Sequence, residues 1–175
     1  MKPLHIIPAA LFAMIGLVFA VGLGLRPSEI PSALVGKAVM PFELPPLYPT
    51  GAGLSSETLK DGKIKLVNIF ASWCAPCRVE HPFLMELKRQ GVTIHAIDYK
   101  DTEPEARLFL AELGSPFSRI GKDRDGRVAI DWGVSGVPET FVVNGEGRIL
   151  YQHIGPLTRQ IVEQEIAPLL RGQKK

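Results

Sequence analysis

Cysteine is scarce in this chain of 175 residues. It has only two, Cys74 and Cys77, both in the stretch ASWCAPCRVEHP. One pair cannot form a framework of several disulfides, and a loop this short removes little entropy from the unfolded chain. Structural zinc takes four ligands, so a zinc site would need His81 and a further group. Both structural uses are therefore poor explanations, and the pair is a candidate reaction centre.

Long runs of one charge are also lacking. The 20 basic and 18 acidic residues are scattered along the chain and give a formal net charge of +2. Nucleic-acid binding depends on a concentrated basic surface, so this function class has little electrostatic support. Internal repeats and low-complexity tracts are absent from the sequence as well.

Charged residues are missing from Leu4 to Leu25. The 20 apolar residues from Ile6 to Leu25 are enough to span about 30 Å of hydrocarbon as a helix. Because Lys2 precedes the run, residues 1–3 are expected in the cytoplasm and the catalytic domain in the periplasm, on a single-pass inner-membrane anchor over residues 4–25. A signal peptide cleaved near residues 20–22 is the alternative, although its apolar core would be shorter, about 7–15 residues.

Beyond the anchor, residues 26–36 are rich in proline and small residues and predict a linker. Residues 37–173 are expected to form one α/β domain. Two β-prone runs, residues 64–70 and 92–98, predict strands buried on both faces. Apolar spacing and capping signals predict the other elements, with a turn-rich KDRDGR segment between the second and third helices. These elements are a short helix within 55–62 with Ser55 or Ser56 as its N-cap, helices at 75–90, 102–114, 128–132 and 158–172, and a hairpin over 139–154.

The predicted strand 64–70 leads directly into the two thiols, so that Cys74 would begin the following helix. Unpaired N–H groups and the helix dipole at that position stabilise a thiolate. Cys74 is therefore the expected exposed, attacking sulfur, and Cys77, one turn later and more buried, would resolve the mixed disulfide. A CxxC between a strand and a helix indicates dithiol–disulfide exchange. Trp73 is expected to pack beside the site and shape access to it.

The motifs WCAPC and GVPET, with Pro82 inside the helix, resemble the thioredoxin fold. The stretches LVNIFASWCAPCRVEHP, DYKD, ELGSPF, DRDGR and GVSGVPETF resemble more closely the DsbE/CcmG family of bacterial cytochrome c maturation. Matching stretches extend from about residue 32 to 170. The resemblance implies a central mixed β-sheet flanked by helices, with Pro138 cis and facing the cysteines. It implies no cofactor and no metal beyond the redox-active pair.

The resemblance also implies roles for two acidic residues. Asn68 stands where general thioredoxins carry a buried Asp, and an amide cannot act as a base, so proton handling would pass to Glu80 and Glu139. Carboxylates near the thiols oppose a thiolate, which favours a reductant over an oxidant. Val137 is expected to offer backbone hydrogen bonds to an extended substrate segment. Tyr99, Lys100 and Asp101, in one stretch, are implied to line the active-site surface, without an assigned role.

The expected activity is therefore that of a protein-disulfide reductase. The resemblance implies that it acts on the heme-binding cysteines of apocytochrome c, or on a maturation protein disulfide-bonded to them. It further implies a membrane electron donor of the DsbD/CcdA type and a monomeric chain. A general periplasmic disulfide reductase or oxidase is one alternative. A copper-delivering protein using Cys74, Cys77 and His81 is another, although copper chaperones of this fold separate their cysteines by three residues.

Overall fold

The computed structural model describes residues 6–24 and 34–172 in two separate units, the first ending at Pro31 and the second beginning at Ser32. The first unit contains α1 (Ile6–Gly24), a 19-residue helix with no acidic or basic side chain. Within the described residues, no helix meets the length and hydropathy that a membrane crossing requires. The predicted cytoplasmic residues 1–3, both ends of the predicted anchor and most of the predicted linker lie outside the described residues.

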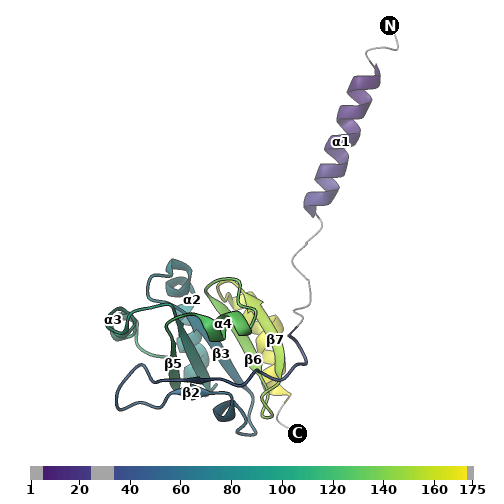
Figure 1. Cartoon of the computed structure of the whole chain (residues 1–175). Helices are drawn as coiled ribbons and strands as arrows, with labels where there is room; N and C mark the ends of the chain where they lie inside the picture. The colour runs from purple at the N-terminus through teal and green to yellow at the C-terminus, as the bar shows by residue number, and fades with distance from the viewer. Residues whose placement is uncertain (1–5, 25–33, 173–175) are drawn as a thin grey trace. The chain divides into compact units, whose positions relative to one another are not determined.

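A five-stranded mixed sheet forms the centre of the second unit, in the order β5-β4-β3-β6-β7. Strands β3, β4 and β5 run parallel, whereas β6 is antiparallel to both β3 and β7. The predicted thioredoxin-like mixed sheet is confirmed (Figure 1). The strands are β3 (Lys65–Phe70), β4 (Ile94–Tyr99), β5 (Arg119–Asp123), β6 (Glu139–Val143) and β7 (Ile149–Ile154).

All six residues of β3 are buried, as the continuous apolar run predicts. Successive side chains of a strand point to opposite faces of its sheet, so β3 contributes to two cores. Val67 and Ile69 belong to the core that contains Trp132. Leu66 and Phe70 face the other side, where the residues of α2 and α3 pack. Burial on both faces fixes the end of β3 and therefore the start of the segment that carries the cysteines.

The four regions predicted to be helical after residue 74 each contain a helix. They are α2 (Ala75–Arg89), α3 (Glu103–Leu113), α4 (Arg127–Asp131) and a C-terminal run of α5 (Arg159–Ile161), η3 (Val162–Ile166) and α6 (Ala167–Arg171). The C-terminal run is not a uniform α-helix, because η3 is a π-helical turn just before Pro168. Proline has no backbone N–H to bond the preceding turn, which is consistent with the irregularity there.

Strand β5 is a correction, because the sequence pattern predicts a turn-rich segment over part of it. Gly, Lys and Asp in a five-residue strand hide the usual β-pattern. Strand β5 forms despite its low β-propensity because it is hydrogen-bonded on both sides. It pairs with β4 on one side, and on the other the N–H of Lys122 donates to Pro45 O at 2.9 Å. Gly121 allows the close approach of the small antiparallel pair β1 (Glu43–Leu44) and β2 (Leu54–Ser55), since a Cβ there would lie 2.7 Å from the Cβ of Leu44. The 3₁₀ turn η2 (Glu57–Leu59) follows β2, with Ser56 as its N-cap, within the segment predicted to be a short helix.

Candidate active site

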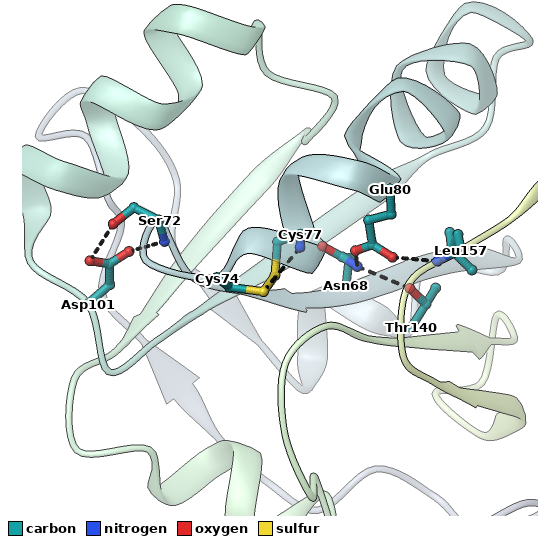
Figure 2. Close-up of a disulfide and its surroundings, with 8 residues drawn as sticks. All are labelled: Asn68, Ser72, Cys74, Cys77, Glu80, Asp101, Thr140 and Leu157. Carbon is teal, nitrogen blue, oxygen red and sulfur yellow. Dashed lines mark hydrogen bonds between the residues drawn. A yellow bond between two sulfur atoms is a disulfide. The ribbon is translucent and has the colours of Figure 1, made fainter.

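The two cysteines lie where β3 passes into α2, and they form a disulfide. Cys74 is the N-cap of α2, and the N–H of Cys77 donates a hydrogen bond of 3.1 Å to Cys74 Sγ. The same N–H also donates to Cys74 O at 3.2 Å, so this donor at the start of α2 is shared between the backbone and the sulfur. The predicted placement of Cys74 at a helix start is confirmed (Figure 2).

The predicted exposure of Cys74 is wrong for this oxidised form. The residue is 3% exposed and Cys77 is 2% exposed. Both belong to a buried cluster with Phe70 and Ala71, and partly buried Val137 packs against the same cluster. The contrast between an exposed and a buried sulfur therefore does not hold while the disulfide is formed.

Val137 and Pro138 bring a second segment of the chain to the cysteines. The Val137–Pro138 peptide bond is cis, as the family resemblance implied. Val137 contacts both the cysteine cluster and the core on the opposite face of the sheet. The carbonyl oxygen of Pro138 accepts a hydrogen bond of 2.9 Å from the N–H of Gly155. Both predicted residues therefore lie in a structured loop at the site, although their roles toward a substrate stay predictions.

Glu80 is completely buried three residues after Cys77, on the same side of α2. Its Oε1 accepts a hydrogen bond of 2.8 Å from Asn68 Nδ2, and its Oε2 accepts one of 2.8 Å from the N–H of Leu157. Burial disfavours the charged carboxylate and raises the pKa of Glu80 to about 7, although both hydrogen bonds oppose the rise. A carboxyl group with such a pKa can both accept and release a proton near neutral pH.

Asn68 links Glu80 to the neighbouring strand. Its Nδ2 also donates a 3.0 Å hydrogen bond to Thr140 Oγ1, and all three side chains are fully buried. Within the described part of the chain, the Oδ1 atom of Asn68 has no hydrogen-bond partner. Figure 2 shows this group of side chains on the Cys77 side of the disulfide.

Glu139 is also buried, but its hydrogen bonds lead to the loop before Pro138. Oε1 accepts from the N–H and Oγ of Ser135, at 2.7 and 2.8 Å, and from the N–H of Gly136 at 3.3 Å. Oε2 accepts from Gln152 Nε2 at 2.7 Å. These contacts support a positioning role for Glu139, and its predicted part in proton transfer stays a prediction.

Trp73 is 59% exposed, and its Nε1 donates a hydrogen bond of 3.2 Å to the carbonyl of Lys100. Its ring therefore presents surface beside the cysteines, and its predicted contact with a substrate stays a prediction. His81 is buried instead, with Nε2 at 2.9 Å from Gly114 O and its ring edge-on to Phe109. Across residues 6–24 and 34–172, no group of three or more His, Cys, Asp or Glu side chains could hold a metal ion.

Two further acidic residues lie at the end of β4 and in the loop that follows it. Asp98, which sequence reasoning missed, ends the apolar run of β4, and Asp101, expected at the site without a role, follows in the loop that reaches the turn before Cys74. Both are buried, with 2% and 8% exposure. An aspartate inside an apolar strand is the signal that could have identified Asp98, since a buried carboxyl group normally has a specific partner.

Comparison with known proteins gives one consistent result. The model of the Redoxin family matches residues 34–167. The thiol:disulfide interchange protein HelX of Rhodobacter capsulatus is 49% identical over 98% of this chain and 97% of its own. The DsbE homolog of Paracoccus denitrificans is 43% identical over 97% and 94%. The crystal structure of a protein described as DsbE from Chlorobium tepidum superposes with a TM-score of 0.63, at 28% identity over 76% of this chain and 95% of that one.

The chain belongs to the DsbE/CcmG family of thiol:disulfide interchange proteins, within the Redoxin family. It is accordingly a disulfide oxidoreductase whose redox-active pair is Cys74 and Cys77. The family recognised from the sequence is confirmed. The Cys74–Cys77 disulfide is therefore the centre of thiol–disulfide exchange, and the roles of Glu80 and Pro138 in that exchange stay predictions.

Proposed function

We propose that this protein is a membrane-anchored periplasmic reductant of cytochrome c biogenesis. It would reduce the heme-binding cysteines of apocytochrome c, or mixed disulfides formed with them, and would be recharged by a membrane electron donor of the DsbD/CcdA type. Cytochrome c maturation enters through the resemblance to the DsbE/CcmG family. Anchoring is supported by the uncharged sequence of residues 4–25, and the periplasmic side by the placement of Lys2 before it.

The observation that carries the reducing direction is the buried carboxyl group of Glu80 beside Cys77. Among the described residues, no Lys, Arg or His side chain hydrogen-bonds to either sulfur, and Glu80 becomes negatively charged as the pH rises above about 7. A negative charge beside buried thiols disfavours the thiolate. DsbA, at roughly −120 mV, is a strong oxidant because its reduced form is stabilised. A protein whose thiolate is disfavoured lacks that stabilisation and donates electrons more readily.

The exchange itself needs no further component. The Cys74 thiolate attacks one sulfur of the substrate disulfide, forming a mixed disulfide and releasing the other substrate sulfur as a thiolate. Cys77 loses its proton, and its thiolate then attacks Cys74 Sγ and releases the second substrate sulfur. Two electrons pass to the substrate, and the protein is left with the Cys74–Cys77 disulfide. In this proposal Glu80 takes the Cys77 proton in the second step.

The first test is the reduction potential of the full-length protein in detergent, by equilibrium titration against glutathione. A value toward the roughly −200 to −270 mV of glutaredoxins and thioredoxin supports a reductant. A value near that of DsbA would overturn the reducing direction and favour an oxidase.

The second test concerns the substrate. Cys77→Ser prevents resolution, so it should accumulate a mixed disulfide with an oxidised apocytochrome peptide containing CxxCH. Cys74→Ser is the matched control and should trap nothing. Equal trapping of unrelated disulfide peptides would contradict a dedicated partner and favour a general disulfide reductase.

A further inference from the structure

Asp101 makes three hydrogen bonds that no thiol chemistry of the site explains. Its Oδ2 accepts from the N–H of Ser72 at 2.5 Å, and its Oδ1 accepts from Ser72 Oγ at 2.9 Å. Oδ1 also accepts from the N–H of Thr102 at 2.7 Å. Figure 2 shows Asp101 and Ser72 beside Cys74, on the side of the disulfide away from Glu80.

Ser72 belongs to the short turn that sets the position of Cys74. The N–H of Cys74 donates to Ala71 O at 3.2 Å, which closes that turn. The next residue, Trp73, is held from the same loop by its hydrogen bond to Lys100 O. Lys100 has a φ of 47°, a left-handed conformation unusual for a residue other than glycine. The loop after β4 therefore adopts a special backbone geometry and holds two successive residues of the turn before Cys74.

We propose that Asp101 is a positioning residue for the attacking cysteine, and that the neighbouring carboxyl group of Asp98 makes this positioning sensitive to pH. Asp101 touches neither sulfur and acts through Ser72. Holding reacting atoms in the correct geometry contributes strongly to rates, and a small displacement of Cys74 Sγ would slow its attack.

Asp98 is the group that can disturb this arrangement. It is 2% exposed, and within the described residues its Oδ1 has no hydrogen-bond partner. In the sheet it lies opposite Phe70 of β3, which carries no charge, and Lys122 of β5. The charged groups that face it are Asp101, Lys122 and, from α3, Glu103. Lys122 is itself paired with Glu103, so its positive charge is shared.

The consequence depends on the charge of Asp98. Burial, followed by the neighbouring Asp101, raises the pKa of Asp98 to about 8, so at neutral pH it is mostly a neutral acid beside a carboxylate. Above pH 8 a second negative charge forms next to Asp101. Repulsion between the two carboxylates would weaken the hold on Ser72. A weaker hold on Ser72 slows attack by Cys74.

This proposal rests on thiol–disulfide exchange at Cys74 and not on the identity of the partner. It is therefore tested with glutathione disulfide, a substrate that needs no recognition by the protein. A failure with this probe says nothing against a role in cytochrome c maturation, and failure to trap an apocytochrome peptide says nothing against the positioning by Asp101.

The experiment compares the full-length wild type with Asp101→Ala, Asp101→Asn and Asp98→Asn. Asp131→Asn is the matched control, because Asp131 is an exposed residue of α4 and the change removes the same charge. The rate of reaction with glutathione disulfide is measured from pH 6 to 10 and divided by the thiolate fraction, obtained from absorbance at 240 nm. Urea unfolding shows whether each variant is folded under the assay conditions.

Asp101→Ala should lower the rate per thiolate about tenfold at pH 7 while remaining folded. Asp101→Asn, which keeps one acceptor oxygen, should recover part of the loss. In the wild type the rate per thiolate should fall through an ionisation near pH 8, and Asp98→Asn should abolish that fall while the Asp131→Asn control retains it. A folded Asp101→Ala protein with an unchanged rate would overturn the positioning role. A fall near pH 8 that persists in Asp98→Asn would overturn the pH dependence.

Discussion

Asn68 donates a hydrogen bond of 2.8 Å from Nδ2 to Oε1 of Glu80, while its own Oδ1 has no partner within the described residues. The amide can therefore serve either protonation state of Glu80. Rotated by half a turn, it would present Oδ1 as an acceptor for the O–H of a protonated Glu80. Asn68, whose amide cannot act as a base, is therefore suited to hydrogen-bond Glu80 in either charge state.

Replacing Glu80 with Gln should remove a pH dependence of stability. The pKa of Glu80 is about 7 in the folded protein, against an ordinary value of 4.5 for a glutamate in the unfolded chain. Between these two pH values, unfolding therefore releases the Glu80 proton. Ionisation of Glu80 does not affect stability below pH 4.5, and it destabilises the folded protein progressively from pH 4.5 to 7. Above pH 7 the full cost is on the order of 3 kcal/mol. Relative to wild type, Glu80→Gln should therefore gain stability across this window, measured by urea unfolding of the oxidised proteins.

The same variant tests the chemistry. Without a carboxyl group beside Cys77, resolution of a trapped mixed disulfide should slow most near neutral pH, where Glu80 changes charge. Stopped-flow measurement of substrate thiol release gives that rate directly. Identical pH profiles for wild type and Glu80→Gln would show that the proton of Cys77 leaves by another route.

Two variants of Glu139 distinguish a role in positioning the loop from a role in proton transfer. Glu139→Ala would leave the N–H groups of Ser135 and Gly136 without their acceptor and should lower the free energy of unfolding by about 1–3 kcal/mol. Glu139→Gln keeps an acceptor for the loop if Gln152 rotates its amide to pair with it. We therefore expect exchange by Glu139→Gln within about twofold of wild type. A large loss in that variant, with stability retained, would support proton transfer by Glu139.

His95 should make the protein sensitive to acid. It is buried, its Nδ1 has no partner among the described residues, and burial followed by the charges of Lys65 and Arg119 lowers its pKa to about 4. As the pH falls from 6.5 to 4, the unfolded chain binds a proton at this site that the folded protein does not. The expected loss is on the order of 3 kcal/mol. His95→Leu should flatten the stability curve between pH 6.5 and 4, and an unchanged slope would contradict this source of acid sensitivity.

Asp123 is expected to hold the start of α4. Its Oδ1 and Oδ2 accept hydrogen bonds from the N–H groups of Val128 and Ala129, at 3.3 and 2.8 Å, and it is 1% exposed. Asp123→Ala leaves two buried donors unpaired and should cost about 1–3 kcal/mol by urea unfolding. Asp125→Ala is the control, because the Asp125 side chain is exposed and accepts a single solvent-accessible hydrogen bond of 3.2 Å from the N–H of Arg127. It should change stability by about 0.5 kcal/mol or less. Equal effects of the two substitutions would show that the hydrogen bonds of Asp123 do not hold the start of α4.

Sequence patterns are sufficient wherever one physical effect dominates. Continuous apolar runs locate β3 and β4, and the strand–CxxC–helix order places Cys74 at the start of α2. They are insufficient where a residue depends on a distant neighbour. Strand β5 forms because β4 and the chain at Pro45 provide its hydrogen bonds, which its own composition does not reveal.

The acidic residues illustrate the same limit. Glu80 is recognisable because it lies one helical turn from Cys77, a relation visible in the sequence. Asp101 is 29 residues from Ser72, and only the parallel pairing of β3 with β4 brings the two together. The burial of Cys74 is equally hidden from the sequence, because the cluster around it gathers residues from separate elements, including Val137.

Concealment of both sulfurs in the oxidised protein has a kinetic consequence. A small thiol diffusing in the surroundings meets almost no sulfur surface, because each cysteine is at most 3% exposed, whereas the indole of Trp73 next to them is freely accessible. We therefore expect free glutathione to reduce this disulfide slowly, so that an equilibrium titration needs a long incubation. A macromolecular partner that binds the exposed Trp73 ring would stay long enough for the turn at Ser72 and Trp73 to open, and should reduce the protein faster.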